Sequence, residues 1–133
     1  MKRVYADMVG DLFHIGHINM LKQAREYGDN LIVGIHSDKT VESYKRKPIL
    51  SESERYEIVK NCKLVDEVIT DAPLVITQDY IKENKIDVVV HGDDTAFTEN
   101  YKVPIDMGIM QYIKYTEGIS TSEIIKRIEN REV

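Results

Sequence analysis

The chain is poor in cysteine and in long apolar runs, and each shortage excludes a class of protein. Its single cysteine, Cys62, cannot form an internal disulfide, so we expect a reducing compartment, the cytoplasm. Residues 1–4 lead directly into a predicted strand, without the apolar core of a signal peptide. No apolar stretch approaches the length that a bilayer requires. We therefore predict a cytoplasmic protein without a membrane span.

Positive charge is also in short supply. The 18 lysines and arginines are outnumbered by 23 aspartates and glutamates, which gives a net charge of −5, and the two signs are interleaved along the chain. Proteins that bind nucleic acid normally present a basic face, so we expect no nucleic-acid partner. A length of 133 residues suits one domain, spanning 1–133, with a single core.

Apolar runs alternate with helical patterns along the whole chain. Expected strands cover 3–6, 31–35, 67–69, 87–90 and 109–113, and expected helices cover 16–27, a segment opened by the capping box at Ser51, 77–84 and 121–129. Gly28 is expected to end the first helix in a left-handed conformation. Segments 38–50 and 95–104 are expected loops. The alternation predicts an α/β fold, a single Rossmann-like domain whose five-stranded parallel sheet is flanked by helices on both faces.

The tetrapeptide His14-Ile15-Gly16-His17 follows the first expected strand and opens the first expected helix. That position places two imidazoles and free backbone N–H groups at a helix N-terminus, where the macrodipole favours anions. Gly16 lets a phosphate approach the backbone without meeting a Cβ. The chain has no Walker loop, so the motif predicts a triphosphate site of another kind.

Two histidines one helical turn apart are also common as metal ligands or without any role. Zinc requires further ligands, and Cys62, His36 and His91 do not offer an obvious set. The pair lies at the end of the first strand, where open α/β sheets bind their ligands. The position therefore favours a nucleotide site and no protein metal site.

Three further segments are candidates for the same site. Lys45-Arg46-Lys47 is either a solvated loop or a source of ammonium groups for a pyrophosphate leaving group. His91-Gly92-Asp93-Asp94 is either a turn or a pair of carboxylates for Mg²⁺ or a nucleobase. In segment 116–122, Ser120 and Glu123 form a capping box, which leaves Thr121 and Ser122 spare for an anion.

With these segments placed, the chain resembles the family that includes glycerol-3-phosphate, choline-phosphate and ethanolamine-phosphate cytidylyltransferases. The resemblance runs nearly from end to end and rests on residues 11–17, 54–56, 65–68, 91–94 and 116–122. The histidine motif alone would also fit adenylyltransferases and class I aminoacyl-tRNA synthetases, but the chain has no room for a tRNA-binding domain. The string Thr-Glu-Gly-Ile-Ser-Thr at 116–121 favours the cytidylyl branch.

The resemblance implies a reaction in which a small phosphorylated alcohol receives CMP from CTP, giving a CDP-alcohol and pyrophosphate. A phosphate oxygen would attack the α-phosphorus in line, without a covalent enzyme intermediate. Mg²⁺ would accompany CTP, with no dedicated protein ligand set evident. The resemblance also implies a homodimer.

The resemblance assigns roles to individual residues. His14, His17 and Lys45, which lies ten residues before Arg55, would be catalytic. The implied nucleotide-binding residues are Asp11, Gly16, His91, Asp94, Thr116, Gly118, Ile119, Ser120 and Thr121. Arg55 would bind the acceptor phosphate through a bidentate fork, with Asp7 and Lys47 also on the acceptor side and Lys47 as the alternative to Lys45.

Two departures from the family pattern keep alternatives open. Met8 stands where the family has glycine, and the glycine occurs at Gly10 instead. Tyr115 replaces the arginine that precedes Thr-Glu-Gly-Ile-Ser, so a charged phosphate contact is lost, with Arg46 as a possible replacement. The alternatives are an adenylyltransferase that uses ATP and a catalytically weak nucleotide-binding module.

The acceptor is not determined by the sequence. Glycerol, ethanolamine, choline and sugar-alcohol phosphates and a phosphonate all remain open. Tyr5, Tyr101 and Tyr112 together with Asp7 could surround an ammonium group, because aromatic faces attract cations. Scattered tyrosines are, however, more often packing residues.

Overall fold

Parallel strands form the centre of the protein in the computed structural model, which describes residues 1–93 and 98–131. The strands found in these residues are β1 (Arg3–Met8), β2 (Asn30–Ile35), β3 (Glu67–Ile69), β4 (Val88–Gly92) and β5 (Met110–Ile113). They form one sheet in the order β3-β2-β1-β4-β5, and every neighbouring pair is parallel. The predicted five-stranded parallel sheet is confirmed.

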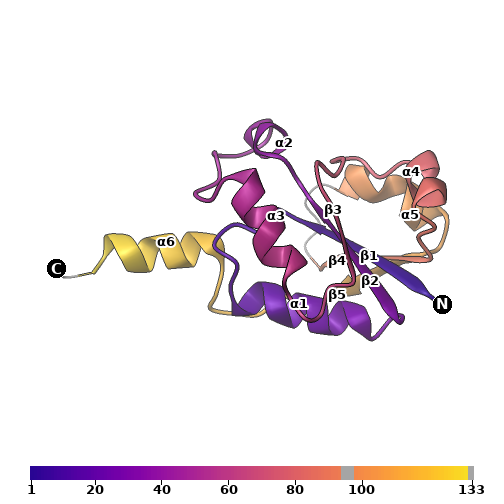
Figure 1. The fold of residues 1–133 in the computed structure, drawn as a ribbon, viewed down its shortest axis with the longest axis horizontal. Coiled ribbons are helices and arrows are strands. Elements are labelled where there is room, and N and C mark those ends of the chain that lie inside the picture. Colours follow the sequence, from indigo (N-terminus) through magenta and orange to yellow (C-terminus); the bar gives the residue numbers. More distant parts are fainter. Residues whose placement is uncertain (94–97, 132–133) are drawn as a thin grey trace.

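Helices cover both faces of this sheet (Figure 1). On one face, α1 (Ile15–Arg25) and α3 (Glu52–Lys60) contribute Leu21 and Val59 to a core with strand residues such as Val33. On the other face lie α4 (Gln78–Glu83), the 3₁₀-helix η1 (Thr98–Tyr101) and α5 (Lys102–Asp106). The central strands are apolar on both sides because each side packs against a helical layer.

Two segments that we expected to be loops contain short helices. Segment 38–50 begins with α2 (Asp38–Glu42), where the Ser37 side chain accepts a hydrogen bond from the Thr40 backbone N–H. Segment 95–104 contains η1 and most of α5, while its residues 95–97 lie outside the described part of the chain. Helices this short give no recognisable apolar period, so the sequence pattern missed them.

Gly28 does not have the left-handed backbone that we predicted for it. Helix α1 ends at Arg25, and the residue that caps it, Glu26, has an ordinary right-handed backbone conformation. A Cβ on Gly28 would lie 2.6 Å from the Lys2 carbonyl oxygen and 2.6 Å from Val4 Cγ2. The glycine is therefore required because the chain passes close to the start of β1.

The sheet order places a ligand crevice between β1 and β4. From β1 the chain proceeds outward through β2 and β3, and then crosses to β4 and β5 on the other side of β1. Ligands of open α/β sheets bind at the carboxyl ends of the strands where the order reverses in this way. Helix α6 (Thr121–Glu129) begins near this end and extends away from the body (Figure 1), with none of its residues buried.

Among the described residues, no helix is long and apolar enough to span a membrane.

Candidate active site

A cavity of about 830 Å³ lies at the carboxyl ends of the central strands, within the size range of small-molecule sites. The predicted site residues that line it are Asp7, Asp11, His14, Gly16, His17, Lys45, Lys47, His91, Thr116, Ile119, Ser120 and Thr121. Gly118 and Arg55 do not line it, and Asp94 lies outside the described residues. The structure thus brings together segments that are more than 100 residues apart in the sequence.

The two histidines of the first motif cap helix α1 with their own rings. His14 Nδ1 accepts a hydrogen bond from the Gly16 N–H at 3.0 Å, and His17 Nδ1 accepts one from the His14 N–H at 3.0 Å. These two backbone N–H groups are therefore not free for an anion, contrary to our prediction. Since both Nδ1 atoms are acceptors, each neutral ring carries its proton on Nε2 and can donate it to a phosphate oxygen.

Both imidazoles are held in the neutral form. Burial, followed by the neighbouring His14, lowers the pKa of His17 from 6.5 to about 4. Burial also lowers the pKa of His14. The rings are close together, with centroids 4.0 Å apart. At neutral pH the pair therefore offers two uncharged N–H donors, and positive charge at the site must come from other residues.

The depressed pKa of His17 predicts a specific loss of stability in acid. The unfolded chain binds a proton at His17 below pH 6.5, whereas the folded chain resists protonation until about pH 4. The free energy of unfolding should therefore fall as the pH drops from 6.5 to 4, by up to about 3 kcal/mol from this residue. Urea unfolding of the wild type and of His17→Gln at pH 7, 5.5 and 4.5 measures this, and the variant should lose less. Equal losses in the two proteins would contradict the assignment.

The carboxylate of Asp11 binds the backbone of the loop that follows α2. Its two oxygens accept hydrogen bonds from the backbone N–H groups of Ile49 and Leu50, at 2.8 and 2.9 Å. Its carbonyl oxygen accepts a hydrogen bond from the Thr121 hydroxyl at 2.9 Å, so that hydroxyl is not spare as we predicted. Asp11 instead ties the loop that follows α2, and the start of α6, to the end of β1.

This loop carries the basic residues to the cavity. Partial burial and the adjacent Arg46 lower the pKa of Lys45. The charge of Lys45 is in turn among the influences that lower the pKa of His17, so the two groups are neighbours. Arg46 Nη2 donates a hydrogen bond to Ser122 Oγ at 3.3 Å, at the start of α6. The cations therefore face the same space as the histidines.

The start of α6 lies beside the start of α1. A Cβ on Gly16 would lie 3.4 Å from Ile119 Cγ2. Gly118 has a φ of +78°, which lets the chain turn into α6, and this is its role in the structure. Ser120 accepts a hydrogen bond from the Glu123 N–H at 3.0 Å, as expected for the capping residue. Two helix N-termini thus meet at one end of the cavity.

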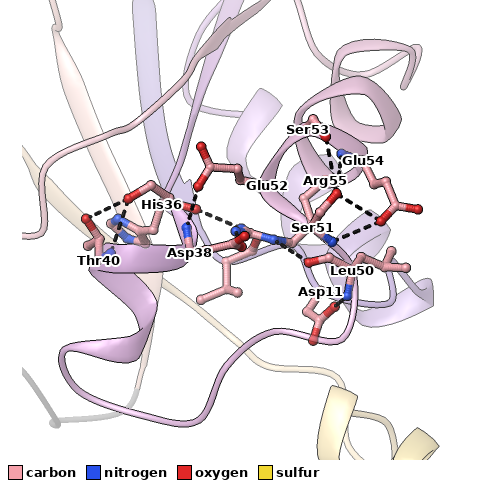
Figure 2. Close-up of polar contacts among 12 residues, drawn as sticks. Asp11, His36, Asp38, Thr40, Leu50, Ser51, Glu52, Ser53, Glu54 and Arg55 are labelled. Atoms are coloured by element: carbon pink, nitrogen blue, oxygen red, sulfur yellow. Dashed lines mark hydrogen bonds and ion pairs between the residues drawn. The ribbon is translucent and has the colours of Figure 1, made fainter.

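Arg55 is not placed to bind a substrate phosphate, contrary to our prediction. Its side chain is fully buried, and four of its five N–H donors are used within the protein (Figure 2). They bind the carbonyl oxygens of Val9, His36 and Leu50 and, at 2.7 Å, the carboxylate of Asp38. The guanidinium therefore joins the ends of β1 and β2 to the loop that carries Lys45.

A buried carboxylate that also lines the cavity, Asp7, is surrounded by rings. Asp7 Oδ1 accepts a hydrogen bond from the Tyr101 hydroxyl at 2.7 Å and lies 3.8 Å from His91 Nδ1. Asp7 Oδ2 lies 3.7 Å from His36 Nε2 and accepts no hydrogen bond from the described residues. Burial raises the pKa of Asp7. A cation at Oδ2 would relieve the cost of holding this charge in the interior.

Tyr44, Tyr101 and Tyr115 all line the cavity, and Tyr101 is the one with a hydrogen bond to Asp7. The sequence left open a group of Tyr5, Tyr101 and Tyr112 around Asp7, with packing roles as the more common alternative for such tyrosines. Tyr5 is instead fully buried, and its hydroxyl accepts a hydrogen bond from Tyr80 at 3.0 Å. Tyr112 is half-exposed and does not line the cavity. Of these three tyrosines, Tyr101 therefore lies beside Asp7, whereas Tyr5 is a packing residue and Tyr112 lies away from the cavity.

Sequence reasoning missed four polar residues at or behind the site. His36 and Tyr44 line the cavity, and Asn19 and Gln23 of α1 bind segment 114–116 from behind. His36 directly follows β2, and His91 is the last but one residue of β4, so the position of His36 at a strand end was the signal that could have identified it. Asn19 and Gln23 are four residues apart and therefore share one face of α1. Two amide side chains on one helix face were the signal that could have indicated a polar contact there.

Comparisons with known proteins agree with this arrangement. The cytidylyltransferase-like family model matches residues 10–127. The ethanolamine-phosphate cytidylyltransferase of Dictyostelium discoideum is 45% identical over 98% of this chain and 39% of its own length. Choline-phosphate cytidylyltransferase 2 of Arabidopsis thaliana is 45% identical over 95% of this chain and 44% of its own length. The chain thus spans about two fifths of these relatives.

A solved structure is similar over nearly its whole length. The lipopolysaccharide core biosynthesis protein of Thermoplasma volcanium has a TM-score of 0.73 and 30% identity, with 87% of this chain and 99% of that chain covered.

Proposed function

The chain belongs to the cytidylyltransferase-like family, and on this basis we propose that it transfers CMP from CTP to a phosphorylated amino alcohol. One observation carries the proposal. A single cavity joins a phosphate-binding end, made of His14, His17 and Lys45 at two helix N-termini, to a buried carboxylate, Asp7. The first end suits a triphosphate, and the second suits an ammonium group.

The reaction needs no protein nucleophile. An oxygen of the acceptor phosphate attacks the α-phosphorus of CTP, the bond from that phosphorus to the oxygen bridging to the β-phosphorus breaks, and pyrophosphate leaves with the electron pair. The attacking oxygen carries no proton at neutral pH, so no general base is required. The Nε2–H groups of His14 and His17 and the Lys45 ammonium would stabilise the charge that develops on the phosphates.

Mg²⁺ enters the proposal as part of the substrate. Within residues 1–93 and 98–131, no three His, Cys, Asp or Glu side chains are grouped so that they could hold a metal ion. The groups that His14, His17 and Lys45 present at the phosphate-binding end of the cavity are N–H donors, which suit phosphate oxygens and not a metal ion. We therefore propose that the ion is carried by the CTP phosphates.

The acceptor is proposed from Asp7 and its surroundings. The carboxylate is buried and accepts a hydrogen bond from Tyr101, and two further tyrosines, Tyr44 and Tyr115, line the same cavity. A carboxylate and aromatic rings both attract a cation. The lining of the cavity therefore favours an amino alcohol, which carries an ammonium group, over glycerol or a sugar alcohol. Relatives named for ethanolamine phosphate and for choline phosphate agree with this choice.

The proposal is tested by following pyrophosphate release. The protein is incubated with Mg²⁺ and either CTP or ATP, and with phosphoethanolamine, phosphocholine or glycerol 3-phosphate. Release with CTP and an amino alcohol phosphate is the expected result. Release only with ATP would identify an adenylyltransferase. Saturable CTP binding by the folded protein without release with any acceptor would identify a nucleotide-binding module.

Asp7→Asn should separate acceptor binding from nucleotide binding. The amide keeps the size of the side chain but removes the charge, so the KM for phosphoethanolamine should rise by about two orders of magnitude. The KM for CTP should change less than about threefold, because the described side chains next to Asp7 are His36, His91 and Tyr101 and not the two histidines of α1. Steady-state kinetics with each substrate varied in turn measures both. A larger effect on CTP than on the acceptor would contradict this placement of Asp7.

Three other sequence-based expectations accompany this proposal. We propose a homodimer, in a cytoplasmic location, that acts without nucleic acid. Light scattering on the eluting protein tests the first of these, with twice the chain mass of 15.4 kDa as the expected result.

A further inference from the structure

Tyr115 is held in place by two side chains of helix α1. Gln23 binds the backbone of Lys114 on both sides, accepting from its N–H at 3.2 Å and donating to its carbonyl oxygen at 2.9 Å. Asn19 Nδ2 donates to the Thr116 hydroxyl at 3.0 Å. The residues before and after Tyr115 are therefore tied to α1, which fixes the backbone from which its ring extends.

The ring of Tyr115 lies directly on the backbone of Gly92, at the end of β4. A Cβ on Gly92 would lie 2.0 Å from Tyr115 Cζ and 2.3 Å from both Cε2 and Oη. Any side chain at Gly92 would displace the ring, so the glycine is what admits it. The ring is 48% exposed and lines the cavity, so it borders the space where a substrate would lie.

That space is next to the carboxylate of Asp7. Gly92 follows His91, whose ring lies 4.4 Å from the ring of Tyr101, the residue that donates to Asp7. The pKa of the Tyr101 hydroxyl is raised first by burial, then by Asp7, and to a smaller extent by Tyr115. The influence of Tyr115 indicates that it lies close to Tyr101. A bulky ring on Gly92 therefore narrows the room beside Asp7.

The Asp7 oxygen that lacks a hydrogen bond indicates which ammonium fits this narrowed space. Oδ2 is buried and accepts no hydrogen bond from the described residues. A primary ammonium is small and donates N–H bonds, so it satisfies this oxygen. A trimethylammonium is larger and has no N–H, so it leaves the oxygen unsatisfied, and sites built for a hydrogen bond reject analogues that lack the donor strongly.

We propose that Tyr115, seated on Gly92, restricts the acceptor site to primary ammonium groups, so that the protein uses phosphoethanolamine in preference to phosphocholine. This inference rests on the proposed function. Tyr115 is then a specificity-determining residue: Asp7 attracts either cation, and the ring on Gly92 excludes the larger one.

The test compares kcat/KM for phosphoethanolamine and for phosphocholine in the wild type and three variants. The wild type should prefer phosphoethanolamine by at least about 100-fold. Tyr115→Ala should reduce this preference at least about tenfold, chiefly by improving the use of phosphocholine. Tyr115→Phe keeps the ring and should keep the preference. Tyr112→Ala, the matched control, removes a tyrosine of similar exposure that does not line the cavity, and it should also keep the preference.

The outcomes separate this inference from the proposed function. Turnover with a wild-type preference for phosphocholine, or an unchanged preference in Tyr115→Ala, would overturn the inference and leave the proposed function in place. Absence of turnover with every acceptor would overturn both. If Tyr115→Ala does not fold, Gly92→Ala, which displaces the same ring, should also reduce the preference, and an unchanged preference there would overturn the inference.

Discussion

Replacing Lys45 with alanine is expected to reduce kcat/KM for CMP transfer by roughly 10²- to 10³-fold. Both histidines are neutral in this site, because burial lowers the pKa of each. The loop after α2 supplies the positive charge beside these neutral rings, and Lys45 is the residue of that loop whose charge influences the pKa of His17. Removal of one preorganised donor to a developing oxyanion costs this much in other enzymes.

Steady-state kinetics at saturating acceptor measures this effect, and the chain provides a matched control. Lys39→Ala removes an exposed lysine of α2 that does not line the cavity and should leave kcat/KM unchanged. Lys47→Ala tests the alternative lysine. If Lys47→Ala were the more damaging change, the catalytic charge would belong to Lys47.

Replacing Arg55 with methionine is expected to lower the free energy of unfolding by about 3 to 5 kcal/mol. Methionine keeps the volume of the side chain but leaves three carbonyl oxygens, on Val9, His36 and Leu50, without their donor. It also removes the partner of Asp38, whose side chain is 27% exposed. Loss of one member of a buried charged network is among the most destabilising single changes.

Urea unfolding of the two proteins measures the loss. Arg25→Met is the matched control, because Arg25 also pairs with an aspartate, Asp66, but the Arg25 side chain is 35% exposed. That variant should lose less than about 1 kcal/mol, as surface pairs do. Equal losses in the two variants would contradict the structural role of Arg55. Full stability with a higher KM for the acceptor would support the phosphate-binding role that the sequence resemblance suggested.

The strands and the longer helices could be predicted because their signals are local. Runs such as Leu31-Ile32-Val33 are apolar on both faces, as strands buried between two layers must be. The capping box at Ser51 and Glu54 marked the start of α3 to the residue. His14 and His17 were correctly placed at the start of α1, although the hydrogen bonds of their Nδ1 atoms were not foreseen.

The contacts that build the site could not be predicted in the same way, because they join distant segments. Asp11 and Arg55 look like ligand-binding residues when read alone. Only the fold shows that Asp11 binds the backbone of Ile49, 38 residues away, and that Arg55 reaches Val9, 46 residues away. The local sequence does not distinguish a charged residue that binds buried backbone groups from a charged residue that binds a substrate.

The cluster around Asp7 could be predicted only in part. Asp7, His36 and His91 are each at or beside the end of a strand, which the sequence shows. Their convergence depends on the order β2-β1-β4, which makes the three strand ends neighbours. The alternation of strands and helices predicts a parallel sheet but not its strand order, so the cluster required the structure.

The most direct test of the account follows the phosphorus atoms themselves. CTP, phosphoethanolamine and Mg²⁺ are incubated with the protein, and the ³¹P NMR spectrum is recorded over time. If CMP is transferred to the acceptor, the phosphomonoester signal of phosphoethanolamine is replaced by the two coupled signals of a diphosphate diester, with one pyrophosphate released for each. Conversion of CTP to CMP and pyrophosphate, or to CDP and phosphate, with the phosphomonoester unchanged, would contradict it.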